Sequence, residues 1–387
     1  MSRRPQGHRV LLRGILLAVF AAVIYMMKGR LQGPVTPLPA PPPSSQRPAA
    51  QPLPQLPSDS SVSSGPAKAD STANAPKPAA KASPVPSRAE SSAQTSLVIA
   101  SWNIEWLGKP DDRSGPARGR AQSAADLAEC LASTGASIVA VEEIIATAGT
   151  NPPRSKELDA TIVELNGRTK GQWDYELFPG RNADDQLTGV LWNIDDVQAV
   201  DAAGAAWDER DSPYRVPVKS GRSAKGNSLW NRPPHAMKFS AGEGRSDIVV
   251  IVVHMKADYQ GDFASHRAEE ATALSESLAA VRKVFVDDDI IVLGDTNCVQ
   301  QVEPALDIYA KAGLRDLNAK NEQTHWRGGS MDRIMVMNGQ PEFAASVFSV
   351  ASDRYLERKR WKPEDFKRVL SDHYPVYATV AIEADDD

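Results

Sequence analysis

Several apolar runs along this chain end in polar side chains. The clearest are SLVIASWN (96–103), ASIVAVEE (136–143), DIVVIVVH (247–254) and DIIVLGDTN (289–297). Uninterrupted apolar runs of this length predict strands that are buried on both faces. Their last residues include Asn103, Glu143, His254, Asp295 and Asn297. Because α/β proteins build sites at the carboxyl ends of such strands, we expect these polar side chains to gather along one edge of a layered core.

The segments between these runs predict helices and further strands. A helix is expected over 118–133, ending at Gly135, and a second over 265–285 with an apolar stripe from Leu274 to Phe285. Additional strands are expected at WDYELF (173–178), TGVLWN (188–193), HAMKFS (235–240), DRIMVM (332–337) and YPVYATVAI (374–382). Residues 199–229 are rich in Asp, Gly and Ser and predict a long loop or insertion.

Residues 1–30 have the pattern of a membrane anchor or a signal segment. A basic stretch precedes the apolar run GILLAVFAAVIYMM (14–27), and KGR follows it. This run is short for a span, which takes about 20 residues, and its length also fits a signal peptide. The lack of a small-residue cleavage site after Met27 favours an uncleaved anchor with its N-terminus inside. We expect the rest of the chain to lie outside the cytoplasm, as a periplasmic or extracellular domain, or as a secreted one if the segment is cleaved.

Residues 31–96 are dominated by Pro, Ala and Ser and offer almost no large apolar side chains to bury. This composition predicts a disordered tether. The folded domain is therefore expected over 97–387, with its ordered part running from near Leu97 to about Glu383. Its length suits one large domain or two small ones, and the sequence contains no internal repeat.

Charge is distributed unevenly. Residues 1–96 hold 11 Lys/Arg and 3 Asp/Glu, and subtracting them from totals of 44 and 49 leaves 33 basic and 46 acidic side chains, a net charge of −13 for the domain. Such a domain does not resemble a tight, nonspecific coat on DNA. The chain has only two cysteines, which excludes a disulfide framework and a zinc cluster; a single bridge stays open.

An acid and an imidazole stand next to each other in LSDHYPV (370–376), just before an apolar strand. Neighbours within a strand point to opposite faces, but at a strand's start Asp372 and His373 can reach into one cleft. Together with the strand ends they form a set of carboxylates, amides and imidazoles. Hard oxygen donors fit Mg²⁺, Mn²⁺ or Ca²⁺, and an imidazole beside a carboxylate supplies a base or a cation near neutral pH. Any one of these residues has a structural explanation, but the set suits in-line hydrolysis of a phosphate ester.

The motifs also carry a family resemblance. SWNIEWLG, IVAVEEI, NRPP…MKF, VVHMKA, LGDTN, MDRIMV and SDHYPV resemble, in order and approximate spacing, those of the endonuclease/exonuclease/phosphatase superfamily, across 97–382. The resemblance implies a four-layered α/β sandwich, with two mixed β-sheets packed face to face and helices outside.

The resemblance also implies a role for each site residue. Glu143 would be the main metal ligand with Asn103 and Asp372 nearby, and the cofactor would be Mg²⁺, with Mn²⁺ or Ca²⁺ able to substitute or assist. Asp295 would orient or activate the attacking water, and Asn297 would hold the phosphate. His373, oriented by Asp332, would contact the scissile phosphate. His254 would be the second phosphate-facing histidine, and Arg232 would contact a DNA phosphate.

The sequence departs from the family pattern at several positions. Glu142 replaces the usual Gln before the metal-ligating Glu, Thr296 is unusual within GDTN, and the acid that pairs with His254 is not identified, with Asp184 and Asp185 as candidates. Other residues are interpreted as surface, structural or core positions: His235, His266, His325, Trp102 and Trp106. The acidic runs at 287–289 and 385–387 are expected to be solvated.

The leading hypothesis is a metal-dependent phosphodiesterase, a deoxyribonuclease I-like nuclease that is monomeric, tethered to the membrane by its N-terminal segment, and acts on DNA rather than RNA. DRI and NRPP favour this branch, and no protein partner is implied. An alternative is a phosphatase or phosphodiesterase that acts on lipid head groups or small-molecule phosphates, as sphingomyelinases and inositol phosphatases do. A catalytically silent binding module is a third hypothesis, and the intact set of acids and imidazoles argues against it.

Overall fold

The computed structural model of the protein describes residues 95–109, 121–169, 171–180, 185–202, 212–218, 221, 229–258 and 263–383. The predicted anchor (1–30) and nearly all of the predicted tether (31–96) lie outside these residues, and the predicted boundaries stay predictions. Among the described residues, no helix combines the length and the apolar character that crossing a bilayer requires.

Two large mixed sheets form the centre of the fold. The first has the order β14-β15-β1-β2-β6-β5, with strands β1 (Ser96–Leu107), β2 (Ile138–Ile144), β5 (Trp173–Leu177), β6 (Leu187–Asn193), β14 (Phe348–Val350) and β15 (Val376–Ala381). In it β1 runs parallel to β2 and antiparallel to β15.

The second sheet has the order β12-β13-β11-β10-β9-β7, and β8 also pairs with β9. Its strands are β7 (Gln198–Val200), β8 (Arg215–Pro217), β9 (His235–Ser240), β10 (Asp247–His254), β11 (Ile290–Asp295), β12 (Leu314–Asp316) and β13 (Asp332–Met337). Only β10 and β11 are parallel among the described pairs of this sheet. A small hairpin of β3 (Gly149–Thr150) and β4 (Pro153–Arg154) stands apart.

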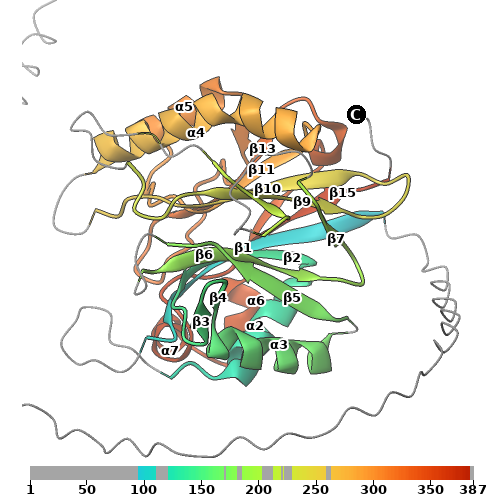
Figure 1. The fold of residues 1–387 in the computed structure, drawn as a ribbon. Helices are drawn as coiled ribbons and strands as arrows, with labels where there is room; N and C mark the ends of the chain where they lie inside the picture. Colours follow the sequence, from blue (N-terminus) through green and yellow to red (C-terminus); the bar gives the residue numbers. More distant parts are fainter. Residues whose placement is uncertain are drawn as a thin grey trace, which may run out of the picture. The chain divides into compact units, whose positions relative to one another are not determined.

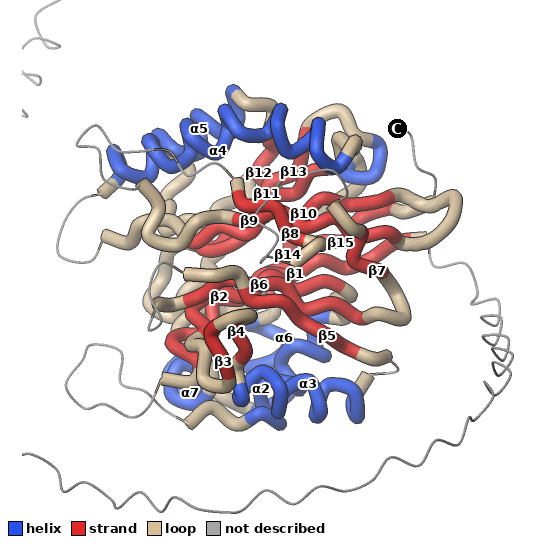
Figure 2. The backbone as a smooth tube through the Cα atoms, viewed as in Figure 1, coloured by secondary structure: helices blue, strands red, loops and turns tan. Residues whose placement is uncertain are grey.

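Helices cover the outer face of each sheet, so that the domain has four layers (Figure 1). On the side of the first sheet lie α2 (Ala124–Thr134), α3 (Lys156–Arg168), α6 (Ser352–Lys359) and α7 (Pro363–Val369). On the side of the second sheet lie α4 (Ala264–Phe285) and α5 (Pro304–Lys311), and a 3₁₀ turn, η1, spans Pro341–Phe343. Figure 2 shows the strands in the two middle layers between the helices. The predicted four-layered sandwich with two mixed sheets is confirmed.

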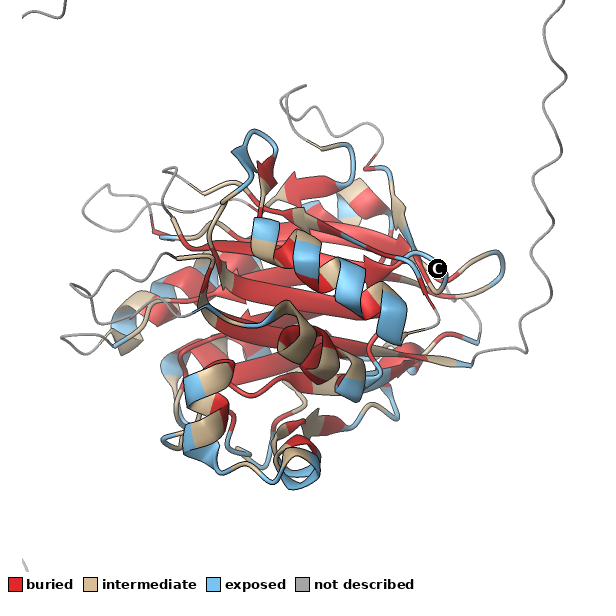
Figure 3. Ribbon diagram, turned by 90° about the horizontal axis from the view of Figure 1, so that it is seen from below, coloured by how far each residue is buried: buried red, intermediate tan, exposed pale blue. Residues whose placement is uncertain are grey.

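Alternating side chains of β1 join different apolar clusters. Leu97 and Ile99 face the second sheet, whereas Ala100 and Trp102 pack with the outer helices. This is the period-two pattern of a strand that is buried on both faces. Figure 3 shows the result: the strands are buried and the exposed residues of the helices lie on their outer faces.

The expected strands are present, and the differences concern ends and short elements. The helix expected from residue 118 begins at Ala124, because Ser123 caps it and accepts a hydrogen bond from the amide of Asp126. It ends, as predicted, at Gly135, which has a left-handed conformation. The predicted loop 199–229 contains β8, since Val216 and Val218 are buried in the core; its other parts lie largely outside the described residues.

Both cysteines are free and buried. Cys130 belongs to the cluster under the helices of the first sheet, and Cys298 belongs to the larger cluster, which includes the strands of the second sheet and residues of α4 and α5. The single bridge that the sequence left open does not form.

Candidate active site

Strand register brings the predicted site residues of the second sheet together. His254 at the end of β10 is paired with Asp295 at the end of β11, and Asp295 is paired with Asp332 at the start of β13. Because β10 is parallel to β11 while β13 is antiparallel to it, these three residues lie at one edge of the sheet. Asn103 of β1 and Glu142 of β2 are paired in the same way in the first sheet.

Residues in the left-handed backbone region surround this edge. Glu105, Trp106, Glu143 and Asn297 have φ angles of 47°, 57°, 63° and 52°. Such conformations are costly for residues other than glycine and are often found at functional sites. The register of β2 with both neighbouring strands shifts at this point. The shift separates two adjacent acids: Glu142 is fully buried and accepts a hydrogen bond from Ser101 Oγ (2.9 Å), whereas Glu143 faces a cleft.

The cleft has a volume of about 780 Å³ and brings together seven of the nine predicted site residues. These are Glu143, Arg232, His254, Asp295, Asn297, Asp372 and His373. The other two, Asn103 and Asp332, are buried directly behind it, with 1% and 0% exposure. Asp372 and His373 both reach the cleft, as their position before a strand predicted.

His373 is held between carboxylates. Its Nδ1 lies 2.9 Å from Asp332 Oδ2, and its Nε2 lies 3.8 Å from Asp295 Oδ2 and 3.9 Å from Asp372 Oδ1. Burial alone would lower the pKa of His373, but the nearby acids, Asp332 first, raise the pKa well above its usual value. The bond to Asp332 therefore orients the ring with Nε2 toward the cleft.

The backbone around His373 is fastened to β1. The Trp102 indole donates to the carbonyl of His373 (2.9 Å), and Ser371 Oγ donates to the carbonyl of Asn103 (2.6 Å) while it accepts from the amide of His373 (3.0 Å). Trp102 is fully buried, as its interpretation as a core residue predicted.

Asp295 lies at the centre of the hydrogen-bond network. Its Oδ1 accepts from the amide of Asn297 (2.9 Å), and its Oδ2 accepts from Asn103 Nδ2 (3.0 Å). The same Oδ2 faces His254 Nε2 at 3.6 Å. Burial is the largest cause that raises the pKa of Asp295. Asn297 donates its side-chain amide to the carbonyl of Met255 (3.1 Å), so its side chain is held in place beside Asp295.

Glu143 and Asp372 supply carboxylate oxygens to the same cleft. Burial raises the pKa of Glu143 to about 7; nearby Arg232 lowers it and the charge of Asp372 raises it. Although burial opposes ionisation, the neighbouring His325, His373 and Lys367 hold the pKa of Asp372 below its usual range. Two partly buried carboxylates that repel each other form a set of hard donors that a divalent cation would stabilise, so these residues fit Mg²⁺.

Asn103 lies behind the cleft and donates to two of its carboxylates, those of Glu143 and Asp295. Its Nδ2 donates to Glu143 Oε1 (3.3 Å) as well as to Asp295, and its Oδ1 accepts from the amide of Glu105 (3.0 Å). In this arrangement Asn103 positions the two acids, and its predicted role as a metal ligand stays a prediction.

His254 has its acidic neighbours on the Nε2 side. That nitrogen lies 3.7 Å from Glu143 Oε1 and 3.6 Å from Asp295 Oδ2. Within the described part of the chain, no group lies within hydrogen-bond distance of the buried Nδ1. Of the two candidate partners, Asp184 lies outside the described residues and Asp185 does not bond Nδ1. Burial lowers the pKa of His254 well below its usual value.

Arg232 lines the same cleft. Its Nη2 contacts Gln186 Oε1, and its charge acts on Glu143 and Asp295. Burial is the first cause that lowers the pKa of its guanidinium.

Three interpretations from the sequence need correction. His325 and Trp106 line the cleft, rather than standing on the surface or in the core. The acidic run at 287–289 is not solvated throughout, because Asp287 and Asp289 are buried, the first with Lys238 Nζ at 3.0 Å; residues 385–387 lie outside the described residues. By contrast, His235 is buried against Phe178, and His266 contacts the carbonyl of Leu229, which agrees with structural roles.

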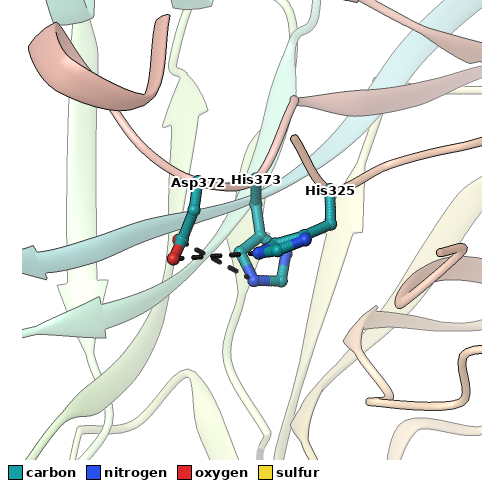
Figure 4. A group of neighbouring side chains, drawn as sticks. All are labelled: His325, Asp372 and His373. Atoms are coloured by element: carbon teal, nitrogen blue, oxygen red, sulfur yellow. Dashed lines mark ion pairs between the residues drawn. The ribbon is translucent and has the colours of Figure 1, made fainter. Parts of the chain in front are cut away.

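No signal within the sequence pointed to His325. It reaches the site because an antiparallel bridge joins it to His373, and Figure 4 shows both rings next to Asp372. His325, Asp372 and His373 have ligand atoms within 4.8 Å of one another, as do Asp295, Asp332 and His373.

Comparisons with known proteins bear on the fold. No protein-family model and no curated protein matches the sequence. Among solved structures, the endonuclease/exonuclease/phosphatase of Bacteroides vulgatus superposes with a TM-score of 0.50 at 14% identity, over 75% of this chain and 100% of that chain.

Two further solved structures are similar. A family protein from Bacteroides thetaiotaomicron has a TM-score of 0.49 at 17% identity (74% and 95% covered), and the human Nocturnin catalytic domain with bound sulfate has 0.48 at 15% (74% and 94% covered). At such identities the likeness concerns the fold alone. From its layers and the Bacteroides vulgatus superposition, the chain has the fold of the endonuclease/exonuclease/phosphatase superfamily, as the resemblance of its motifs implied.

Proposed function

We propose that the protein is a divalent-metal-dependent phosphodiesterase, and more narrowly a nuclease that hydrolyses nucleic-acid phosphodiester bonds, with DNA favoured over RNA. The observation that carries this proposal is the acid–imidazole–acid array Asp332–His373–Asp295, which faces Glu143 and Asp372 across one cleft. The array combines groups that orient a water with groups that stabilise charge on a phosphoryl oxygen.

The residues divide the chemistry between them. Asp295 Oδ2, which faces both His254 and His373, orients and activates a water for in-line attack. His373, held by Asp332, donates its Nε2–H to a phosphoryl oxygen. His254 has no described partner at Nδ1, and its Nε2, which faces Glu143 and Asp295, is the ring nitrogen that contacts a phosphoryl oxygen. Mg²⁺ held by Glu143 and Asp372, beside Asn103, would neutralise phosphate charge.

The first test concerns the metal-binding acid. Glu143→Gln keeps the shape of the side chain and removes the charge that a hard cation needs, so we expect loss of activity with partial recovery at raised Mg²⁺ or Mn²⁺. The measurement is hydrolysis of plasmid DNA, RNA, sphingomyelin and a phosphomonoester, each with and without Mg²⁺. Glu164→Gln on the exposed side of α3 is the matched control. Full wild-type activity after thorough chelation would refute the metal dependence.

The second test concerns the substrate and uses Arg232. A domain with net charge −13 repels a polyanion, so attraction depends on local cations such as Arg232. We expect Arg232→Ala to lower kcat/KM on DNA by roughly ten- to a hundredfold, as for a lost charge-assisted hydrogen bond. Hydrolysis of bis(nitrophenyl) phosphate should change little, because it has no neighbouring phosphate, and Arg168→Ala serves as the control.

Other results of this test point elsewhere. An equal loss on both substrates would place Arg232 at the reacting phosphate, which its closeness to Glu143 also allows. Turnover of a phospholipid head group or a sugar phosphate, with no cleavage of DNA or RNA, would favour the alternative hypothesis of a lipid or small-molecule phosphoesterase.

The location and assembly of the enzyme are also proposals. We propose that residues 1–30 anchor a monomeric catalytic domain outside the cytoplasm. Fractionation of cells that express the full chain, with protease added to intact cells or spheroplasts, tests this; a protected, cytoplasmic domain would refute it.

A further inference from the structure

Three histidines line the cleft, and they differ in how far their side chains are exposed. His254 and His373 both face Asp295 Oδ2, and the ring of His325 packs edge-on against that of His373, with centroids 5.0 Å apart. Their side chains are 2%, 8% and 14% exposed in that order. His325 is therefore the outermost of the three, next to Asp372 (Figure 4).

The backbone fixes His325 as firmly as it fixes His373. The amide of Trp326 donates to the carbonyl of Asp372 (2.9 Å), and the amide of Tyr374 donates to the carbonyl of Thr324 (2.8 Å). These two bonds flank the bridge between His325 and His373. The carbonyl of His325 also accepts from the amide of Gly328 (2.9 Å). The ring is thus preorganised by the same segment that carries the reacting histidine.

The hydrogen bonds of His325 leave a donor available. Its Nδ1 accepts from the amide of Arg327 (3.3 Å), which places the ring proton on Nε2. That Nε2 lies 3.8 Å from Asp372 Oδ2, which is too far for a hydrogen bond. A protonated Nε2 is also a poor metal ligand, because coordination needs its lone pair. The geometry therefore favours donation to an oxygen of the substrate.

The charge around this donor suits an anion. Arg327 is exposed, lines the cleft and stacks on the Trp326 ring at 4.7 Å. Within the described residues, no carboxylate lies within ion-pair distance of its guanidinium. The negative charge of Asp372 opposes the binding of an anion here, but Lys367 offsets it, with Nζ 3.3 Å from Asp372 Oδ2.

We propose that His325 is a substrate-binding residue whose Nε2–H donates to an oxygen of the phosphodiester next to the scissile one. The proposal rests on the proposed nuclease function, since only a nucleic-acid strand offers such a neighbour. His254 and His373 contact the scissile phosphate. The more exposed His325, with Arg327 beside it, therefore contacts the next phosphodiester along the nucleic-acid strand. This arrangement places a substrate-binding subsite beside Asp372, next to the reaction centre. We therefore expect the protein to prefer a phosphodiester bond inside a nucleic-acid strand to a minimal diester.

The test compares two variants on two substrates. We expect His325→Ala to raise KM for a single-stranded or duplex oligonucleotide by about tenfold, the scale of a hydrogen bond to a charged group, with kcat nearly unchanged. Any loss on bis(nitrophenyl) phosphate should be several-fold smaller than on the oligonucleotide, because this diester has no neighbouring phosphate. His325→Gln offers an amide N–H in place of the ring donor and should recover most of the oligonucleotide affinity, which a merely structural role would not produce.

The matched control is His266→Ala, which removes a partly exposed histidine that does not line the cleft. Thermal unfolding verifies that each variant is folded. An unchanged KM for the oligonucleotide in His325→Ala overturns the proposal while the wild-type nuclease activity stands. An equal loss on both substrates, or a raised Mg²⁺ requirement, overturns it in favour of a role at the reacting phosphate or the metal. Wild-type protein that hydrolyses the minimal diester but neither DNA nor RNA overturns the proposed function and this inference together.

Discussion

Asp332 and Arg333 are adjacent residues of β13, and both are fully buried, but they belong to two different regions of the molecule. Asp332 bonds His373 at the cleft. Arg333 points to the opposite face, into the interior. There Nη1 donates to Asp316 Oδ2 (2.7 Å) and the carbonyl of Asn318 (3.2 Å), and Nη2 donates to Asn321 Oδ1 (2.7 Å) and the carbonyl of Cys298 (3.1 Å).

The two regions bury charge in different ways. In the interior, both Nη atoms of the Arg333 guanidinium donate to acceptors at hydrogen-bond distance. In the cleft, His254 and His373 lie 3.6–3.8 Å from Asp295 Oδ2, close enough for attraction but too far for a direct bond. A buried charge that lacks close partners is costly to maintain. The cleft therefore holds hydrogen-bonding capacity that a substrate can use, whereas the interior uses its own for stability.

The largest effect that distinguishes the two regions is expected from His373→Gln. Glutamine keeps an N–H for Asp332 but cannot carry the positive charge or transfer a proton, so we expect activity to fall by about 10²- to 10⁴-fold. The free energy of unfolding should change little. Steady-state kinetics and urea unfolding measure both quantities. A nearly normal rate in a folded variant would remove His373 from the mechanism.

The converse effect is expected from Arg333→Ala. This change leaves Asp316 and several carbonyls without their donor, so we expect the free energy of unfolding to drop by about 3–5 kcal/mol. The rate per folded molecule should be close to that of the wild type, because Arg333 faces away from the cleft. Activity is normalised to the folded fraction from the same urea titration. A small loss of stability, or a large loss of rate per folded molecule, would contradict the division between the two regions.

The smallest effect concerns a histidine of the interior, His235. Its ring stacks on Phe178 with centroids 4.9 Å apart, and burial lowers its pKa to about 3. Between that value and the pKa of about 6.5 in the unfolded chain, the unfolded state binds more protons, so stability falls as the pH drops through this window. Each such group contributes up to about 1.4 kcal/mol per pH unit. Above pH 6.5, His235 therefore does not reduce the stability of the wild-type protein.

The variant His235→Phe removes that contribution. We expect its unfolding free energy to depend less on pH between 4 and 6, by about one proton, while the lowered pKa of His254 still adds its own share. Urea unfolding at several pH values measures the slope. Identical slopes in the two proteins would mean that His235 titrates normally in the folded state.

Local sequence was sufficient for the strands and for the edge at which their polar ends gather, whereas the four-layered arrangement was implied by the resemblance of the motifs. The apolar runs that end at Asn103, His254 and Asp295 form strands because their side chains can be buried on both faces, and such strands must be paired and covered by helices. Placing polar residues at the ends of these runs puts them at one edge of the sheets, which is why Glu143, His254 and Asp295 meet there. These are consequences of period and position along single strands, which a sequence displays directly.

The tertiary structure decided the features that depend on contacts between distant segments. His325 becomes part of the site only because the segment before β13 pairs with the segment before β15. Glu142 and Glu143 separate into buried and cleft-facing acids because β2 shifts its register against both neighbours. Asp287, in the turn between α4 and β11, is buried against Lys238 of β9, whose Nζ lies 3.0 Å from Asp287 Oδ2. The sequence does not show which partner will compensate the burial of a charged residue, because that partner becomes its neighbour only when the chain folds.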